Sequence, residues 1–529
     1  MNIYLIGVII SIVVYMLVGN FAGKKVKDVN DYYVSGRNAG TLLIAGTLFA
    51  SMVSTNSFLG DTAWIYDGNF GIAILLNGIN VAGYVIGPLI FGRYLRRAET
   101  LTMPEYFGKR FNSRRIQRFA GFSTAFALII YLIAVTKASG MIISKLTNFS
   151  YPVCLVIAFI AFTSFTFFSG SKGVILTDTM MFMLFIGATV IAAPFIFEQA
   201  GGLSDLFVNI ANNPQAAPDA VRYFSTGSDK IGNLWYAIAL GSVWLIAFCV
   251  SPWQAGRGMM AKNEHVVIRA GATAAIFCAA FLPLTYFFGL SMIQIKPGVS
   301  PSEYIMINAC MEVMPKLIGV LVLTGIVAAG LSSASTFLSV ASFSVTNDLF
   351  SMKFKDDKHQ LRVSRMSMAV VAVIALFFAY MDLEAIRVIS WFSSTVIAAS
   401  WGVVAVASIF SKKVSEKGAF WGMITGFVML VGLTLFSNMV HPIPNYFHPF
   451  FLALIGSLVV TIVLSRLYPP KAPELDYQTK LLVVPAKERK LADYQRDIKY
   501  GYGLIVAGLA ITAFLVVVWV LPVGQMLGG

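Results

Sequence analysis

The sequence predicts an all-α, polytopic membrane protein from its composition, its recurring apolar stretches and the placement of its basic residues. Of its 529 residues, 57% are hydrophobic and only 12% are charged, whereas soluble proteins carry about 25% charged residues. The mean hydropathy is +0.77. This polar content is too low to cover several soluble domains, but it suits a chain that crosses a bilayer many times.

Fourteen apolar stretches are predicted to cross the membrane as helices, each of which needs about 20 residues. They are residues 2–20, 41–65, 70–92, 119–144, 150–168, 173–196, 233–252, 267–294, 317–346, 363–381, 385–409, 418–437, 449–465 and 501–522. The stretches 150–168 and 385–409 have polar flanks or a short apolar run. The first stretch lacks the basic start and the small-residue cleavage site of a signal peptide, so we expect it to be retained.

Lys and Arg residues are distributed unequally between the two sides of these spans. With the N-terminus outside, 32 of the 39 basic residues fall in inside loops, 5 fall outside and 2 lie within spans. Because basic residues concentrate in cytoplasmic loops, the sequence predicts a cell (inner or plasma) membrane protein with both termini outside. We interpret the net charge of +14 as a consequence of membrane topology and of contact between the basic loops and anionic lipid. We expect no nucleic-acid partner.

The sequence lacks the motifs of enzymes and of cofactor-binding proteins. Its four cysteines have no metal-ligand spacing and its four histidines are scattered. No P-loop and no paired-carboxylate pattern occurs. We therefore expect no catalytic residues, no enzyme activity and no cofactor.

Asp178 is an acidic residue about six positions inside a predicted span. A charged side chain at the centre of a membrane helix costs about 2.5–3.5 kcal/mol on insertion scales. A bound cation, a proton or a basic side chain could offset this cost. The sequence therefore predicts either an ion site or a structural ion pair at Asp178.

Hydroxyl-bearing residues interrupt the span 317–346. Ser332, Ser335 and Thr336 are spaced i, i+3 and i+4, so they share one helix face, while Ser333 points to the neighbouring sector. Hard cations prefer oxygen ligands of this kind. The alternative is structural, because small and hydroxyl residues also join membrane helices to one another.

A polar run lies in the middle of the second span, where Ser54 to Ser57 are four consecutive residues with low helix propensity. Gly46 and Gly60 flank this run. The pattern indicates a broken helix, whose freed carbonyls can coordinate cations and whose half-helix N-terminus can meet an anionic group. A kinked but continuous helix is the alternative.

Two basic residues lie inside spans. Lys137 is about two turns from the outer end of its span, so its amine could reach the interface or face a cavity and pair with a substrate carboxylate. Arg387 is closer to a span end, and we interpret it as an interfacial anchor.

Five segments resemble, in order, motifs of the sodium:solute symporter family, which includes proline, pantothenate, sialic acid and sugar symporters. The segments are DYYVSGRNAG (31–40), TMPEYFGKRFNSRRIQR (102–118), FSGSKGVILTDTM (168–180), GRGMMAKNEHVVIRAG (256–271) and AAGLSSASTFLSVASFSVTNDLF (328–350). The resemblance covers about residues 25–465. It implies a LeuT-type core of two inverted five-helix repeats.

The resemblance also implies how the chain is divided. An extra helix and a cytoplasmic loop (1–40) precede the first repeat (41–196), an outer loop (197–232) and the second repeat (233–409) follow, and three further helices end the chain (410–529). The last part includes a Pro-rich, charged cytoplasmic linker at about 467–498. We expect the final helix to be peripheral.

Two sodium sites and a substrate site follow from the resemblance. The first sodium site would use the carbonyls of Ala50, Val53 and Ala329 and the hydroxyls of Ser332 and Ser333. A second sodium site would use Asp178, Ser332, Ser335 and Thr336, which predicts two sodium ions per cycle. The positions matching the substrate lining are Ser54, Asn56, Ser57, Asn77, Tyr131 and Trp244. Lys137 departs from the family pattern and favours a carboxylate-bearing solute or an amino acid.

The function predicted from these features is sodium-coupled symport of a small organic solute by alternating access. We expect the carrier to act as a monomer surrounded by membrane lipid, with Na+ as the coupling ion. A proton-coupled carrier of the same fold, with Asp178 as the proton site, is one alternative. A membrane sensor that binds solute without transporting it is another.

Overall fold

The predicted helical fold is confirmed in the computed structural model, which describes residues 2–23, 29–213, 229–350, 352, 354–381 and 384–526. The N-terminal half contains α1 (Ile3–Gly23), α2 (Val29–Val34), α3 (Thr41–Met52), α4 (Thr62–Trp64), α5 (Phe70–Val81), α6 (Gly83–Gly87), α7 (Arg93–Ala98), α8 (Met103–Arg110), α9 (Arg114–Thr147), α10 (Tyr151–Gln199) and α11 (Leu206–Asn212). The C-terminal half contains α13 (Lys230–Val250), α14 (Ala255–Gly258), α15 (Glu264–Ile295), α16 (Ile305–Asn308), α17 (Lys316–Phe343), α18 (Asp357–Tyr380), α19 (Ile386–Phe410), α20 (Glu416–Met439), α21 (Pro449–Leu467), α22 (Ala472–Leu482), α23 (Leu491–Leu515) and α24 (Leu521–Met526). Much of the predicted outer loop 197–232 lies outside the described residues.

Twelve helices among the described residues are long and apolar enough to cross a membrane. The predicted count of fourteen is therefore not confirmed by length and composition. Two predicted spans, 41–65 and 150–168, coincide with the shorter apolar helices Thr41–Met52 and Tyr151–Phe167. The second of these forms part of α10, which has 49 residues, whereas about 20 residues suffice for one span.

The predicted break in the second span is confirmed. Helix α3 ends at Met52, and a π-helical segment, η2 (Asn56–Asp61), begins four residues later. The Ser54 hydroxyl accepts a hydrogen bond from the Asn56 amide at 3.1 Å, which is the way a serine stabilises a helix N-terminus. A side chain that competes for backbone groups therefore separates the two half-helices.

A second interrupted helix begins the other predicted repeat. Helix α13 ends at Val250, residues 251–254 form a turn, and the one-turn helix α14 follows. Pro252 explains the interruption, because proline has no amide hydrogen and disfavours a helical conformation in the preceding residue. Each of the two predicted repeats thus starts with a helix that is interrupted at buried residues.

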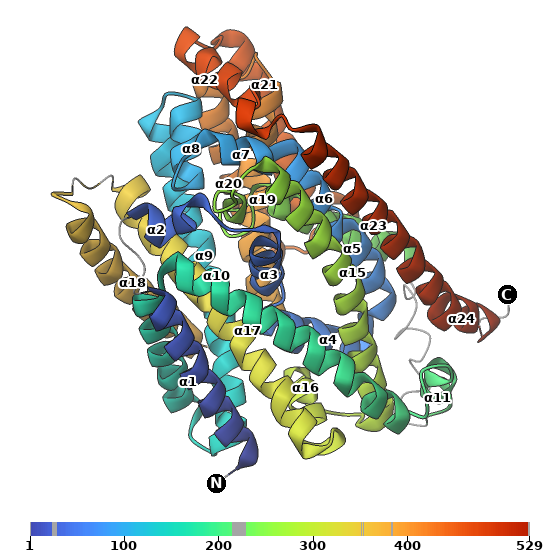
Figure 1. Cartoon of the computed structure of the whole chain (residues 1–529). Coiled ribbons are helices and arrows are strands. Elements are labelled where there is room, and N and C mark those ends of the chain that lie inside the picture. Colours follow the sequence, from blue (N-terminus) through green and yellow to red (C-terminus); the bar gives the residue numbers. More distant parts are fainter. Residues whose placement is uncertain are drawn as a thin grey trace.

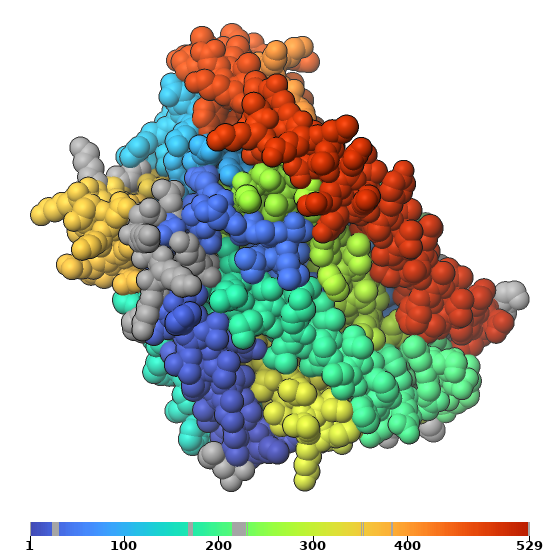
Figure 2. Space-filling view, in the orientation of Figure 1, coloured from blue at the N-terminus to red at the C-terminus, as the bar shows by residue number. Residues whose placement is uncertain are grey.

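The first interrupted helix, α3, packs against two of the longest helices of the bundle, α10 and α15. Helix α17 packs against α9 and α10, and α10 also contacts α1 and α3. In the apolar window of α17, 83% of the residues are buried, compared with none in the last span, Leu491–Met526. Figure 1 shows α3, α10 and α17 near the middle of the view. Figure 2 shows the last helices lying along the outside of the molecule, as expected for a peripheral final helix.

The predicted linker 467–498 contains helix α22, which is docked onto the core. Arg110 Nη1 donates to the Glu474 carbonyl at 3.0 Å, and Gln478 Nε2 donates to the Ile409 carbonyl at 2.6 Å. Farther along, Arg269 Nε lies 2.6 Å from Asp497 Oδ1, which joins α15 to the start of α23. These contacts attach the C-terminal segment to the end of the bundle that carries the basic loops.

Candidate functional site

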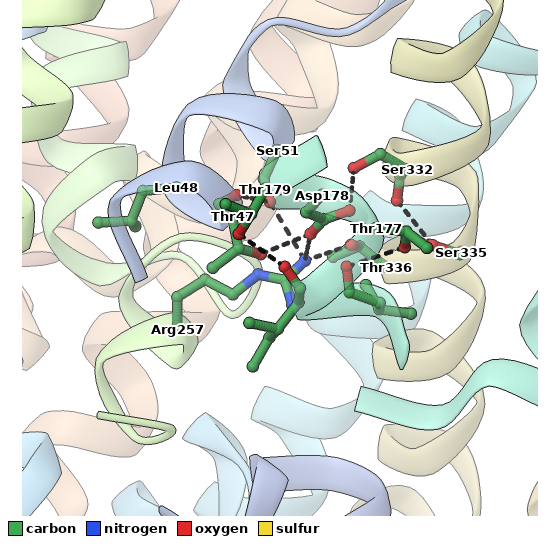
Figure 3. Close-up of polar contacts among 12 residues, drawn as sticks. Thr47, Leu48, Ser51, Thr177, Asp178, Thr179, Arg257, Ser332, Ser335 and Thr336 are labelled. Atoms are coloured by element: carbon green, nitrogen blue, oxygen red, sulfur yellow. Dashed lines mark hydrogen bonds and ion pairs between the residues drawn. The ribbon is translucent and has the colours of Figure 1, made fainter. Parts of the chain in front are cut away.

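Asp178 is the centre of a buried polar cluster shared by three helices (Figure 3). Its side chain is fully buried on α10. Thr47 Oγ1 of α3 donates to Asp178 Oδ2 at 2.5 Å, and Ser332 Oγ of α17 donates to Asp178 Oδ1 at 2.5 Å. Each carboxylate oxygen therefore has a hydroxyl donor from a different helix.

Arg257 of α14 supplies the positive charge of this cluster. Its Nη2 lies 3.5 Å from Asp178 Oδ2 and donates to Ser51 Oγ at 3.1 Å and to Thr336 Oγ1. Only 4% of the Arg257 side chain is exposed. A bound cation, a proton or a basic side chain could offset the cost of burying Asp178. Of these three, the structure shows the basic side chain. Sequence reasoning missed it because Arg257 sits in a short loop motif 79 residues away.

The structure brings together all four residues predicted for a second sodium site. Ser332 contacts Asp178 directly, and Thr336 reaches the cluster through Arg257. Ser335 Oγ donates to the Ser332 carbonyl of its own helix at 2.8 Å. These four residues lie at one place in the bundle, and their oxygens already have protein partners.

The helix break exposes the carbonyls predicted for the first sodium site. In a continuous helix the Ser54 amide would bond to the Ala50 carbonyl, but it donates to the Met52 carbonyl at 2.9 Å instead. The Ser57 amide, the helical partner of the Val53 carbonyl, donates to the Ser54 carbonyl at 3.0 Å. The carbonyls of Ala50 and Val53 are therefore outside the regular helical ladder, which favours binding of a cation.

Helix α17 approaches this break closely at Gly330. A Cβ atom on Gly330 would lie 2.9 Å from Thr55 Cγ2 and 3.0 Å from Ser139 Oγ, so only glycine fits there without a shift. The neighbouring Ser333 hydroxyl is buried and has no hydrogen-bond partner among the described residues, and the same is true of the hydroxyls of Thr55 and Ser139. Buried hydroxyls are normally satisfied, so these three retain the capacity to bind a ligand.

The residues predicted for the substrate site are divided between the break and three other helices, α5, α9 and α13. Ser54, Asn56 and Ser57 are buried in the break. Tyr131 of α9 and Trp244 of α13 are buried with their ring centroids 6.5 Å apart. Asn77 is buried on α5, which packs against α13.

Sequence reasoning missed three other rings at this place. Tyr131 also packs against Trp253 and Phe337, at 6.1 and 4.5 Å between centroids, and Trp244 packs against Trp391 at 5.6 Å. These rings lie on elements distant in sequence. Isolated aromatic residues in apolar spans do not indicate, from the sequence alone, that they pack together.

Lys137 of α9 contacts the segment that precedes α19. Its Nζ donates to the carbonyl oxygen of Glu384 at 2.8 Å, in the connection between α18 and α19. Of the two sequence interpretations, this contact favours the one in which the amine reaches towards the outer end of the span.

Arg387 is buried, so its interpretation as an interfacial anchor is wrong. Its Nε lies 3.4 Å from Asp61 Oδ1, and 9% of its side chain is exposed. The guanidinium carbon lies 3.5 Å from the ring centroid of Trp64 and 4.2 Å from that of Trp391. This cation-aromatic arrangement joins the half-helix after the break to α19.

A cavity of about 50 Å³ lies next to the Asp178 cluster and has room for only a few water molecules. Arg257, Thr336 and Trp253 line it. Its other lining residues include Val34 of α2 and Thr102 before α8, which the distribution of basic residues assigns to the cytoplasmic side. The polar cluster is therefore approached from the predicted inside.

The arrangement of a broken helix beside a serine-rich helix agrees with a comparison to known families. A model of the sodium:solute symporter family matches residues 32–426. The chain belongs to this family. Membership confirms the resemblance found in the five sequence segments and places the protein among sodium-coupled transporters of the membrane.

Curated relatives in this family are transporters of different solutes. A sodium/proline symporter of Salmonella typhimurium is 24% identical over 79% of this chain and 84% of its own length. An osmoregulated proline transporter of Bacillus subtilis is 24% identical over 88% of this chain and 96% of its own. Sodium/glucose cotransporter 1 of Oryctolagus cuniculus is 26% identical over 81% of this chain and 70% of its own.

A solved structure shares the fold. The substrate-bound, outward-open state of a Na+-coupled sialic acid symporter matches with a TM-score of 0.75 and 18% identity, over 89% of this chain and 99% of that chain. The predicted transporter fold is thereby confirmed.

Proposed function

We propose that this chain carries a small organic solute into the cell together with Na+, and that Na+ binds between the break after α3 and helix α17. The observation that supports this most directly is the freed carbonyls of Ala50 and Val53 beside α17, where the Ser333 hydroxyl is buried without a partner. Family membership supports sodium as the coupling ion. The Ala329 carbonyl and the Ser332 hydroxyl would complete the ligand set.

A carboxylate-bearing solute or an amino acid is the substrate class that we propose. The half-helix beginning at Asn56 presents its N-terminus to the break, and helix N-termini favour anionic groups. Ser54, Asn56 and Ser57 would contact the polar part of the solute, and Tyr131 and Trp244 its apolar part. Asn77 is the fourth polar side chain that we assign to the lining. Lys137 would act at the outer approach.

Alternating access would follow from the two interrupted helices. Sodium binding at the break orders the half-helices and creates the solute site. Movement of one repeat against the other then opens the cavity beside Arg257 towards the cytoplasm, and the Asp61–Arg387 contact closes the opposite side. A potential of 100 mV contributes about 2.3 kcal/mol for each charge moved.

Topology and assembly are part of the same proposal. Both termini would face outside, because the docked segment around α22 lies with the basic loops, and α23 and α24 run from there towards the opposite end (Figure 1). The bundle encloses both interrupted helices within one chain, so we propose that a monomer is functional.

Uptake by the full-length protein in proteoliposomes tests this function. We expect one or more solutes from a panel of amino acids, organic acids and sugars to accumulate only with an inward Na+ gradient, and carboxylate-bearing solutes to dominate. An equal K+ gradient is the control. Accumulation driven by a proton gradient alone would favour the proton-coupled alternative, and absence of any sodium-dependent uptake would favour a sensor.

A further inference from the structure

We propose that Arg257 takes the place of a sodium ion at the predicted second site, so that this chain binds one Na+ at a time rather than two. This inference rests on the proposed sodium-coupled function. It assigns Arg257 as the residue that sets the number of coupling ions. The contacts, charge and attachment of this arginine support the assignment.

The oxygens of the two predicted sites differ in how they are satisfied. At the second site Asp178 receives hydroxyl donors on both carboxylate oxygens, Thr336 receives a donor from Arg257, and Ser335 donates to its own helix. At the first site the Ser333 hydroxyl has no partner among the described residues. Protein groups thus complete the second site, while the first keeps coordinating capacity for an ion.

Charge opposes a sodium ion beside Asp178. The Arg257 guanidinium lies 3.5 Å from the carboxylate that would have to bind the ion. A sodium ion on the same carboxylate would be only a few ångströms from the guanidinium, in surroundings from which water is largely excluded. Like charges repel strongly under these conditions. The buried Asp178 carboxylate can pair with either Arg257 or a sodium ion. Arg257 belongs to the chain itself and already contacts the carboxylate.

Arg257 is held in the cluster by its attachment to the fold. Its helix α14 follows the second interruption, and the next residues are fixed to the start of α3. The Ala39 amide donates to the Met260 carbonyl at 3.1 Å, and the Lys262 amide donates to the Ala39 carbonyl at 3.0 Å. The guanidinium is therefore presented by a buried segment that is hydrogen-bonded to the residues just before α3.

Equilibrium binding of radiolabelled sodium to the purified full-length protein tests the assignment. We expect one sodium ion per chain for the wild type and two for Arg257→Gln, because glutamine removes the charge and leaves Asp178 available. Arg257→Lys keeps the charge and should still bind one. Arg257→Gln combined with Asp178→Asn should return the number from two to one.

Arg269→Gln is the matched control, because Arg269 is another buried, paired arginine but lies at the α15–α23 contact. It should leave one sodium ion per chain. Two sodium ions bound to the wild type, or an unchanged number in Arg257→Gln, would overturn the inference while leaving the proposed function intact. Absence of any saturable sodium binding would instead contradict the proposed function.

Discussion

Ser333→Ala is expected to weaken sodium activation of transport at least about 10-fold while leaving the stability of the protein unchanged. The Ser333 hydroxyl is buried and makes no hydrogen bond among the described residues, so its removal breaks no hydrogen bond within that part of the chain. Its proposed bond is to Na+. Interactions of this kind with a charged group contribute about 1.5–3 kcal/mol, and each 1.4 kcal/mol changes an affinity about tenfold.

The sodium concentration for half-maximal uptake measures the first effect, and thermal unfolding in detergent measures the second. Ser342→Ala is a matched control, because Ser342 is a buried serine of the same helix that donates to the Ser339 carbonyl at 3.0 Å. It should change sodium activation little. Equal sodium activation in Ser333→Ala and the wild type would remove Ser333 from the ion site.

Asp178→Asn is expected to destabilise the folded protein by about 3–5 kcal/mol, which is the cost of removing one partner of a buried ion pair. The variant keeps the shape of the side chain but leaves the Arg257 guanidinium, only 4% exposed, without its anionic partner. Adding Arg257→Gln should recover much of this loss, because the remaining charge is then also removed. Unfolding of the four proteins in a double-mutant cycle measures the coupling.

Asp205→Asn provides the control, since Asp205 is an exposed aspartate before α11 whose side chain makes no capping hydrogen bond. It should cost little stability. If the losses of Asp178→Asn and Arg257→Gln simply add in the double variant, the two side chains do not form the pair described here.

The sequence alone could predict the parts of the site that carry a local signal. Asp178 is conspicuous because a carboxyl group inside an apolar span is costly. The break after α3 is visible because four polar residues follow one another, and the i, i+3, i+4 pattern places Ser332 and Thr336 on one face. These signals depend only on neighbouring residues and on helix periodicity.

Other parts of the site depend on contacts between segments distant in sequence. Arg257 follows an interruption at Pro252 and reads as an ordinary loop residue until α14 places it against α3 and α10. Arg387 lies near a span end, so its sequence position suggests an anchor, but Asp61 and two tryptophans enclose it. Residue spacing in the sequence predicts neither the pairing of Arg257 with Asp178 nor that of Arg387 with Asp61.

The number of membrane spans could not be predicted from length and apolarity alone, and the reason is physical. Length and apolarity define a span only when one straight helix crosses the bilayer. Helix α3 stops after 12 residues, where the chain opens before η2, so this break shortens a helix that would otherwise meet the criterion.

Sodium movement driven by solute tests the central claim most directly. Proteoliposomes containing the full-length protein would receive radiolabelled Na+ at equal concentration on both sides, with the membrane potential clamped, and then an inward gradient of the solute found in the uptake panel. We predict net inward movement of Na+ that Ser333→Ala reduces at the same sodium concentration. Solute entry without any movement of Na+ would contradict coupled transport through this site.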